Sequence, residues 1–304
     1  MMKWEKRGLI FGAAERSAWM NNSALQPTPI ILDDRIRVFC GFRDKDGIGR
    51  VGYVDLNPDN PSEVIGYSEN PCLDIGKPGC FDDNGVVPCA VTRVDDKIYL
   101  FYAGYNLGHH VRMTIFCGLA ISEDDGKTFV RTSNVPIMDR TNNEFLFRVI
   151  HTAIKTNSGW LLYYGAGNHF LQGKKKTLPV YEVERLEVTE LGELSKEGEK
   201  VVCNEGDEYR VGRPYVVKDG DVWRMFFGGG SEAITYKLAY AESKDGKKWT
   251  RMDDKLNLHC SDKGWDSEMM AYPSFVRYKD KAYLFYNGNN YGYDGFGYAE
   301  LMQE

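Results

Sequence analysis

Acidic side chains stand directly before apolar segments at several places in the chain. The stretch "GWDSEMMAYPSFV" (264–276) has Asp266 and Glu268 just ahead of a run of β-forming residues. A lone carboxylate is costly to bury unless it is paired or hydrogen-bonded. We therefore expect these two acids either to have partners or to do chemistry, for which carboxylates serve as general acids and bases.

Three further stretches place polar residues ahead of, or inside, such a segment. They are "FDDNGVVP" (81–88), "NNEFLFRVIH" (142–151) and "GDEYRVGRP" (206–214). The candidate residues from all four stretches are Asp82, Asp83, Glu144, Arg148, His151, Glu208, Arg210, Arg213, Asp266, Glu268 and Tyr272. Guanidinium groups match carboxylates and phosphates with two parallel hydrogen bonds. Acids and arginines in one site would therefore suit acid–base chemistry on an anionic ligand.

An internal repeat indicates which elements position these residues. Four segments share an apolar strand, a polar turn and an aromatic-rich strand that ends in small residues. They are "VVPCAVTRVDDKIYLFYAGY" (86–105), "VIHTAIKTNSGWLLYYGAG" (149–167), "GRPYVVKDGDVWRMFFGGG" (212–230) and "AYPSFVRYKDKAYLFYNGN" (271–289), with a weaker copy at 27–44. Turn formers separate the two strands of each pair, namely Asp95-Asp96, Asn157-Ser158-Gly159, Asp219-Gly220 and Lys279-Asp280.

A third strand follows in every copy, and two copies continue into a fourth, at 122–131 and 243–251. The last copy ends after its third strand, and "KWEKRGLIF" (3–11) resembles the missing fourth. The repeat predicts an all-β fold, a five-bladed β-propeller closed by the N-terminal strand, with residues 1–304 as a single domain. A β-sandwich is the alternative. In a propeller the first strand of each blade lines the channel, so the candidate residues would surround one mouth.

Composition narrows the classes of partner. The net charge of −6 argues against a nonspecific nucleic-acid binder, which needs a basic surface. The seven cysteines are scattered and form no CxxC pair, which favours reduced thiols in a cytoplasmic protein. The N-terminal residues predict neither a signal peptide nor a membrane span. We therefore expect a cytoplasmic protein with no nucleic-acid or membrane partner.

Motifs for metals and cofactors are missing from the sequence. His109-His110 has no third ligand at a recognisable spacing, and no P-loop, GxGxxG or GxSxG motif occurs. We expect no metal and no cofactor, and a small molecule or oligosaccharide as the ligand. In "YNGNNYGYDGFG" (286–297), Asn287 and Tyr291 are further candidates, because amides and phenols hydrogen-bond sugar hydroxyls.

Several candidates also fit a purely structural role. Asp82 fits a turn, and Glu208 with Arg210 fits a surface ion pair of little energetic value. His151, inside an apolar strand, fits a core histidine. The glycine-rich stretch 286–297 fits an ordinary loop between strands.

The five copies resemble, over the whole chain, the propeller glycosidases of the arabinanase, invertase and levansucrase type, including the mannoside phosphorylases. The phrases "FDDNGVVP", "GLAISEDDGKTFVR" and "WDSEMMAYP…LFYNGNNYGYDGFGYA" are most similar to uncharacterised glycosidase-like propellers of bacterial polysaccharide gene clusters. The part "SEDDGKTF" also resembles the Asp-box of sialidases, which is a structural turn.

The resemblance implies two carboxylates acting on a glycosidic bond. Such enzymes place aspartates in blades one and two and a glutamate in blade three. Asp83 and Glu144 match the second and third positions, but blade one offers Gln26, and Asn22 stands where invertases have the nucleophile. An amide cannot replace a carboxylate in this chemistry. We therefore expect Asp83 and Glu268 to be the acid/base pair, with Glu144 in reserve.

The remaining candidates would bind the substrate. Arg148 and Arg213 would hold an anionic group, and His151 and Tyr272 would orient hydroxyls. The other binding candidates are Asp82, Arg210, Asp266, Asn287 and Tyr291. The leading hypothesis is a glycoside hydrolase-like enzyme that acts on an acidic or phosphorylated sugar. A phosphorylase, which needs only one carboxylate, and a non-catalytic sugar-binding propeller in polysaccharide metabolism are the alternatives.

Overall fold

The structure consists almost entirely of β-strands. The computed structural model describes residues 1–304 and contains strands β1 to β20 and two helices of four residues each. The helices are α1 (Asp253–Leu256) and α2 (Asn289–Gly292). Neither is long and apolar enough to cross a membrane. The prediction of an all-β fold is confirmed.

The strands pair into antiparallel groups, which we number 1 to 5 along the chain. Group 1 contains β2 (Asn22–Ile31), β3 (Ile36–Arg43), β4 (Gly49–Asn57) and β5 (Asn60–Tyr67). Group 2 contains β6 (Val86–Val94), β7 (Lys97–Leu107), β8 (Met113–Ser122) and β9 (Val130–Arg131). Group 3 contains β10 (Phe147–Thr156), β11 (Gly159–Gln172), β12 (Thr177–Val188) and β13 (Glu199–Val202). Group 4 contains β14 (Glu208–Asp219), β15 (Val222–Ser231), β16 (Lys237–Ser243) and β17 (Thr250–Arg251). Group 5 contains β18 (Ala271–Tyr278), β19 (Lys281–Asn287), β20 (Phe296–Gln303) and β1 (Lys3–Phe11).

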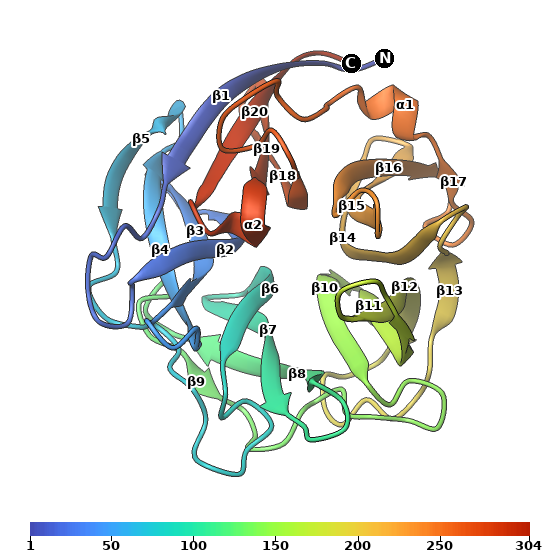
Figure 1. The fold of residues 1–304 in the computed structure, drawn as a ribbon. Helices are drawn as coiled ribbons and strands as arrows, with labels where there is room; N and C mark the ends of the chain where they lie inside the picture. Colours follow the sequence, from blue (N-terminus) through green and yellow to red (C-terminus); the bar gives the residue numbers. More distant parts are fainter.

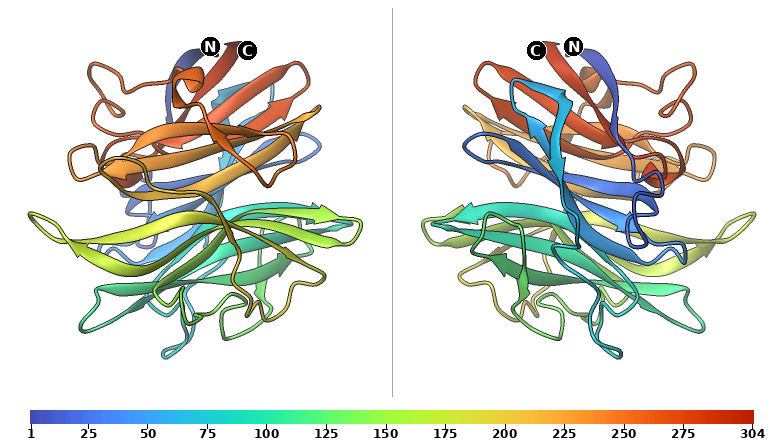
Figure 2. Two further views of the ribbon diagram at one scale, coloured as in Figure 1. Left: turned by 90° about the vertical axis from the view of Figure 1, so that its right-hand side faces the viewer. Right: turned by 90° about the vertical axis from the view of Figure 1, so that its left-hand side faces the viewer.

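The N-terminal strand completes the last group. β1 pairs antiparallel with β20, with Trp4 opposite Leu301. The two chain ends therefore lie side by side (Figures 1 and 2). The sequence predicted this pairing from the likeness of residues 3–11 to the fourth strands of the other copies.

The groups surround a central axis (Figure 1). The first strand of each group is innermost and contacts the first strands of the two neighbouring groups. Groups 2, 3 and 4 also share parallel pairings, Phe147 with Ile115 and Tyr181 with Arg210. These pairings join them into one open sheet whose strand order runs from β17 to β6, whereas groups 1 and 5 each form a separate sheet.

The apolar core is divided among the contacts between neighbouring groups. One buried cluster joins groups 1 and 2, and similar clusters join groups 2 and 3, groups 3 and 4, and groups 4 and 5. A fifth cluster, which includes Val38 and Phe285, joins group 5 back to group 1. Burial of apolar surface between sheets therefore continues all the way around the axis.

Hydroxyl groups connect the innermost strands near the axis. The hydroxyl of Thr152 on β10 donates to the carbonyl of Pro214 on β14 at 2.7 Å. The hydroxyl of Ser274 on β18 donates to the carbonyl of Pro27 on β2 at 2.6 Å. Each bond satisfies a buried carbonyl and ties one group to another.

The turns that follow β8 and β16, at residues 122–126 and 243–246, are structural, as the resemblance of the first to an Asp-box implies. Asp124 accepts the backbone N–H of Thr128 at 2.9 Å, and Asp245 accepts that of Lys248 at 2.9 Å. The second turn docks on the preceding group, because Tyr163 on β11 donates its hydroxyl to the carbonyl of Gly246 at 2.6 Å.

Candidate functional site

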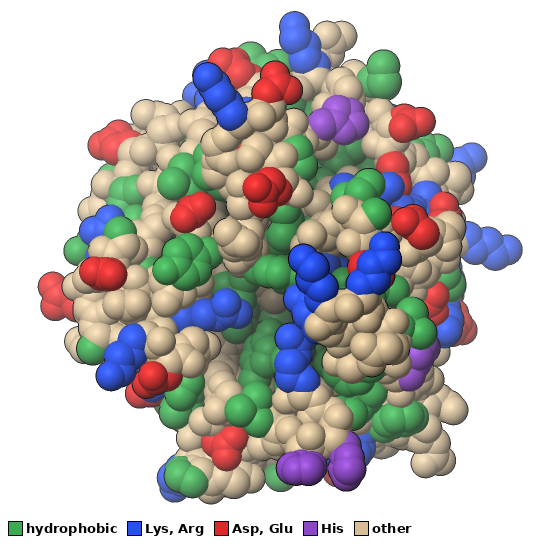
Figure 3. Space-filling view, viewed as in Figure 1, with side chains coloured by type: hydrophobic (Ala, Val, Ile, Leu, Met, Phe, Trp, Pro, Cys, Tyr) green, Lys and Arg blue, Asp and Glu red, His purple; other side chains and the backbone are tan.

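A cavity of about 390 Å³ opens at the centre of the molecule, near the beginnings of the innermost strands. All five groups or their loops contribute to its wall. Figure 3 shows the hollow at the centre of this face, with Lys and Arg side chains at its edge. Its size is in the usual range for small-molecule sites.

The polar lining contains cations and phenols but no carboxylate. The cations are Arg43, Arg112, Lys176, Arg210 and Arg213. The phenols are Tyr105, Tyr181, Tyr209, Tyr236, Tyr272 and Tyr291. Gln26 and His151 complete the polar set, and no Asp or Glu lines the cavity. The site therefore has a positive field and many hydrogen-bonding groups.

An irregularity repeated in every innermost strand directs side chains into this cavity. Each of β2, β6, β10, β14 and β18 contains one residue more than its hairpin partner at the corresponding place. Such bulges re-aim side chains next to active sites. At these bulges Gln26, Arg213 and Tyr272 have φ values of 55°, 57° and 57°, each directly before a proline. His151 is the extra residue of β10.

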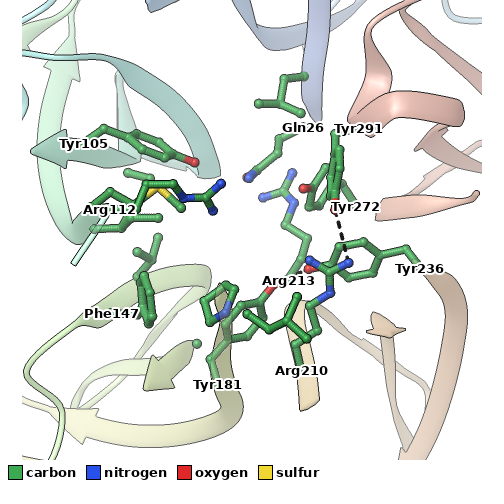
Figure 4. Close-up of a pocket in the computed structure, with 18 of the residues that line it drawn as sticks. Gln26, Tyr105, Arg112, Phe147, Tyr181, Arg210, Arg213, Tyr236, Tyr272 and Tyr291 are labelled. Atoms are coloured by element: carbon green, nitrogen blue, oxygen red, sulfur yellow. Dashed lines mark hydrogen bonds between the residues drawn. The ribbon is translucent and has the colours of Figure 1, made fainter. Parts of the chain in front are cut away.

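Left-handed backbone at non-glycine residues is strained by about 1–3 kcal/mol each and tends to occur at functional sites. Three such residues at matching positions of different groups indicate a selected arrangement. In Figure 4 the side chains of Gln26, Arg213 and Tyr272 meet at the centre of the cavity.

Arg213 lines the cavity at its centre and is 4% exposed. Its guanidinium donates to the carbonyls of Cys89 and Pro27 and to the hydroxyl of Thr28, the last at 2.9 Å. These bonds join group 4 to groups 1 and 2. Its Nε has no partner and no carboxylate is paired with it. Its positive charge is therefore buried and uncompensated.

Arg210 forms one wall of the cavity among tyrosines. Its guanidinium carbon lies 3.9 Å from the ring centre of Tyr236 and 5.7 Å from that of Tyr291. It donates to the Tyr291 hydroxyl at 3.4 Å, the contact drawn in Figure 4. The hydroxyls of Tyr236 and Tyr181 also contact each other. Like Arg213, this arginine is buried, has an Nε without a partner and forms no ion pair.

The arginines of the cavity differ from those elsewhere in the molecule in that they form no ion pairs. Outside the cavity, every arginine except Arg16 forms an ion pair, and these are Arg7, Arg35, Arg37, Arg50, Arg93, Arg131, Arg140, Arg148, Arg185, Arg224, Arg251 and Arg277. None of the four cavity arginines forms one. A ligand anion is the partner that this distribution favours.

His151 lies half-buried in the cavity wall, and its buried Nδ1 has no protein partner. Burial and the nearby charge of Arg213 hold the pKa of His151 well below its usual value. The imidazole is therefore neutral at physiological pH. Its predicted place at the mouth of the channel is observed, whereas its predicted role in orienting hydroxyls stays a prediction.

Asp82 and Asp266 do not line the cavity, and the expectation that they converge there is wrong. Each carboxylate forms an ion pair with a cation on the outermost strand of its own group. Arg131 on β9 binds Asp82 at 2.8 Å, and Lys6 on β1 binds Asp266 at 2.7 Å. Each also accepts a tyrosine hydroxyl from the second strand, from Tyr102 and Tyr286 respectively.

Glu208 follows the same pattern in group 4. Arg251 on β17 binds it at 2.8 Å, so Glu208 is not paired with Arg210 as the sequence suggested. We call the three contacts Arg131–Asp82, Arg251–Glu208 and Lys6–Asp266 the outer-strand ion pairs. Each one fastens the outermost strand to the segment that enters the innermost strand. These pairs explain why an acid can precede an apolar strand, because each of the three acids is paired with a cation of its own group.

Glu144 and Arg148 form a buried ion pair in group 3 rather than part of the central cavity. Arg148 also donates to the carbonyls of Leu194 and Lys196, at 2.9 and 2.7 Å. The hydroxyl of Tyr164 lies 2.9 Å from Glu144 and 2.9 Å from Glu184. The prediction that Arg148 holds a ligand at the channel mouth is wrong, because all its charge is used within the protein.

The predicted acid/base pair is not assembled. Asp83 accepts the N–H of Gly79 at 2.8 Å and the amide of Asn106 at 3.3 Å, in the loop before β6. The side chain of Glu268 is exposed, and neither residue lines the cavity. Both residues precede the innermost strand of their group, as the sequence predicted, but they do not meet at one opening.

Asn287 has a positioning role. It accepts the backbone N–H of Gln26 at 2.7 Å and donates to the carbonyls of Ala24 and Gly295. These bonds hold the bulge that presents Gln26, but leave no group of Asn287 for a ligand. Of the predicted site residues, His151, Arg210, Arg213, Tyr272 and Tyr291 line the cavity.

Sequence reasoning missed most of the outer lining. Arg43 ends β3, Arg112 precedes β8, and Lys176 is the last residue of the basic run 174–176 in the β11–β12 hairpin. The run of three lysines is the sequence signal that could have identified this part of the lining. No group of three or more His, Cys, Asp or Glu side chains is placed to hold a metal ion.

Comparisons with known proteins agree with this architecture. No family model matches the chain. It is 28% identical over 303 residues to the uncharacterized protein Rv1502 of Mycobacterium tuberculosis (strain ATCC 25618 / H37Rv), with 99% of each protein covered.

Solved structures give the fold. BT0996, solved as an RGII complex, has a TM-score of 0.76 at 19% identity, covering 100% of this protein and 92% of that one. A thermostable family-43 glycoside hydrolase has a TM-score of 0.68 at 15% identity, covering 93% and 90%. The chain therefore shares the fold of solved glycoside hydrolase structures, as the resemblance implied.

Proposed function

We propose that the chain is a single-domain, five-bladed propeller whose central cavity binds an acidic or phosphorylated sugar and acts on its glycosidic bond. The five groups and the five apolar clusters between them support the blade count. The likeness to glycoside hydrolases, and to BT0996 in an RGII complex, supports a carbohydrate ligand. The scattered cysteines support a cytoplasmic location.

One observation carries the proposal: the cavity gathers four arginines without an ion pair and excludes every carboxylate. Two of these arginines are buried, and burying an unpaired charge costs free energy that a bound anion would recover. Six tyrosines and Gln26 supply the neutral donors and acceptors that sugar hydroxyls need.

The absence of carboxylates from the lining favours a second candidate, a propeller that binds an acidic sugar without turnover. The usual hydrolytic mechanism requires two acids at the bond, about 5–9.5 Å apart, and the cavity supplies none. Phosphorolysis also requires one acid. The lining therefore supports binding of an acidic sugar more strongly than it supports hydrolysis.

Calorimetric titration of matched sugars tests the binding proposal. We expect glucuronic acid, galacturonic acid and sugar phosphates to bind at least about tenfold more tightly than the corresponding neutral sugars, because charge-assisted hydrogen bonds contribute about 1.5–3 kcal/mol. Arg112→Gln, in the exposed part of the wall, should reduce this preference. Arg16→Gln is the matched control, since Arg16 also forms no ion pair but lies outside the cavity. Equal affinity for acidic and neutral sugars would contradict the proposal.

Mass spectrometry of oligosaccharide products then separates the reactions. Hydrolysis adds one water, phosphorolysis gives a sugar phosphate only when phosphate is present, and an unchanged substrate that binds tightly supports the non-catalytic candidate.

A further inference from the structure

The cavity contains the groups of a different reaction from the one that two carboxylates perform. Its lining offers a neutral imidazole, protonated phenols and guanidinium groups. These groups suit removal of a proton from the carbon next to a carboxylate, where the base must be unprotonated and the charge of the carboxylate must be neutralised.

His151 is the cavity group best suited to accept a proton. The other basic side chains of the lining are four arginines and one lysine, which are already protonated. Burial raises the pKa of Tyr272 and of Tyr181, so neither phenol is an anion at neutral pH. The buried Nδ1 of His151 has no protein partner, and Gly165 leaves space beside the ring.

The two buried arginines supply the neutralising charge. A carbanion next to a carboxylate spreads its charge onto the carboxylate oxygens, and fixed cations beside those oxygens stabilise it. Arg213 is held rigidly by bonds to three groups and still has no counter-ion. Arg210 presents an unpartnered Nε from the neighbouring wall. Neither needs to break an ion pair to receive a carboxylate.

Tyr272 is placed to donate a proton. It occupies the bulge of β18, next along the ring from the bulge of β14 that carries Arg213. Its hydroxyl makes no hydrogen bond within the protein, and in Figure 4 its side chain lies beside that of Arg213. His151, Arg213 and Tyr272 thus come from equivalent bulges of three consecutive groups.

We propose that the cavity cleaves a uronic-acid-containing oligosaccharide by β-elimination, with His151 as the base, Arg213 and Arg210 against the carboxylate, and Tyr272 as the acid. This inference rests on the proposed function, since it requires an acidic sugar in the cavity. It replaces hydrolysis by a reaction that needs no carboxylate of the protein and no water, metal or oxidant.

His151 takes the proton from the ring carbon that bears the carboxylate. The freed electron pair forms a double bond to the adjacent ring carbon, whose bond to the glycosidic oxygen breaks. That oxygen takes the proton of Tyr272 and leaves as an alcohol. Proton transfer from the imidazolium to the phenolate, through solvent, restores both residues.

Oligogalacturonides and oligoglucuronides are the probes, with their reduced, neutral counterparts as controls. The elimination product is an unsaturated uronide, detected by its ultraviolet absorbance, and the two product masses sum to the mass of the substrate. We expect absorbance and chain cleavage to rise together with an acidic probe and not with its neutral counterpart. Calorimetry on the same probes measures binding separately.

Variants sharpen the test. His151→Gln and Tyr272→Phe should each lower the elimination rate at least about a hundredfold, the usual value of general acid–base catalysis, with affinity for the acidic probe changed only a few-fold. Asp83→Asn and Glu268→Gln, outside the cavity, should leave the rate unchanged. Circular dichroism and melting curves confirm folding of each variant.

The outcomes are distinguishable. Products that together contain one added water overturn the elimination and leave the proposed function standing. Tight binding of every acidic probe without cleavage also overturns the elimination, and favours the non-catalytic candidate. Failure of all acidic probes to bind overturns both proposals.

Discussion

Buried arginines are paired with carboxylates in the outer-strand ion pairs but have no carboxylate partner in the central cavity. In the outer-strand ion pairs, Arg131 and Arg251 each bind a carboxylate of their own group. In the cavity, Arg210 and Arg213 are as deeply buried as the acids of those pairs, yet they have no carboxylate partner. A buried charge with a partner holds a fold together, whereas a buried charge without one is a cost that a ligand can offset.

The largest effect is expected from breaking the buried pair of group 3. Arg148→Met removes the ion-pair partner of Glu144 and the donor to three backbone carbonyls, those of Asp139, Leu194 and Lys196. We expect a loss of about 3–5 kcal/mol in the free energy of unfolding, measured by urea denaturation. Arg93→Met removes an exposed pair with Asp125 and should cost less than about 1 kcal/mol. Equal losses for the two variants would contradict the assignment of Arg148 to the framework.

The opposite result is expected for a cavity arginine. Arg210→Met removes an unpaired buried charge, so the free energy of unfolding should stay the same or rise, while affinity for an acidic sugar falls about 10- to 100-fold. Arg251→Met in the same group should lower stability and leave affinity unchanged, because Arg251 binds Glu208 and Asp253. The comparison fails if Arg210→Met destabilises the protein as much as Arg251→Met.

A pH effect is expected from group 3. Burial and the neighbouring Glu144 raise the pKa of Glu184 to about 8, whereas an unfolded glutamate titrates near about 4.3. Between these values the folded protein binds more protons than the unfolded chain, so stability falls as pH rises through this window. Melting temperatures should therefore be lower at pH 9 than at pH 6, and Glu184→Gln should reduce the difference.

Glu182→Gln is the matched control for this effect. A hydrogen bond from Lys200 offsets burial and keeps the pKa of Glu182 below its usual value. The stability that Glu182 contributes is therefore lost only as pH falls through that lowered pKa. Its replacement should leave the change between pH 6 and pH 9 intact.

The smallest effects are expected at the two acids that sequence analysis favoured for catalysis. Asp83→Asn and Glu268→Gln keep the shape of exposed or half-buried side chains outside the cavity. We expect changes below about 0.5 kcal/mol in stability and about twofold in affinity for an acidic sugar. A hundredfold loss of activity in either variant would return that acid to the catalytic site.

The strand pattern was readable because it is local. Turn formers such as Asp95-Asp96 and Lys279-Asp280 lie between alternating apolar runs, and the structure has turns at both places. The pairing of β1 with β20 was also readable, since "KWEKR" matches "KKWTR" in the last strand of group 4. The same match also indicates the outer-strand ion pairs, because Lys6 and Arg251 occupy corresponding positions and both bind an acid.

The sequence could not predict in this way that the acids belong to the framework and not to the cavity. Asp82 and its partner Arg131 are 49 residues apart, and Lys6 and Asp266 are 260 apart. Nothing in the residues around Asp266 distinguishes an acid that meets Lys6 from one that faces the axis. The outer lining was equally hidden, because Arg43 ends the weakest copy of the repeat and Arg112 lies outside the repeated phrases.

The amino-acid order by itself determined the β-strands, their turns, the repeat and the prolines that follow Gln26, Arg213 and Tyr272, because each depends on preferences of adjacent residues. Only the tertiary structure decided which charges are neutralised and which remain open to a ligand. That outcome depends on distances of a few ångströms between residues far apart in the chain, since electrostatic attraction weakens with separation and strengthens with burial.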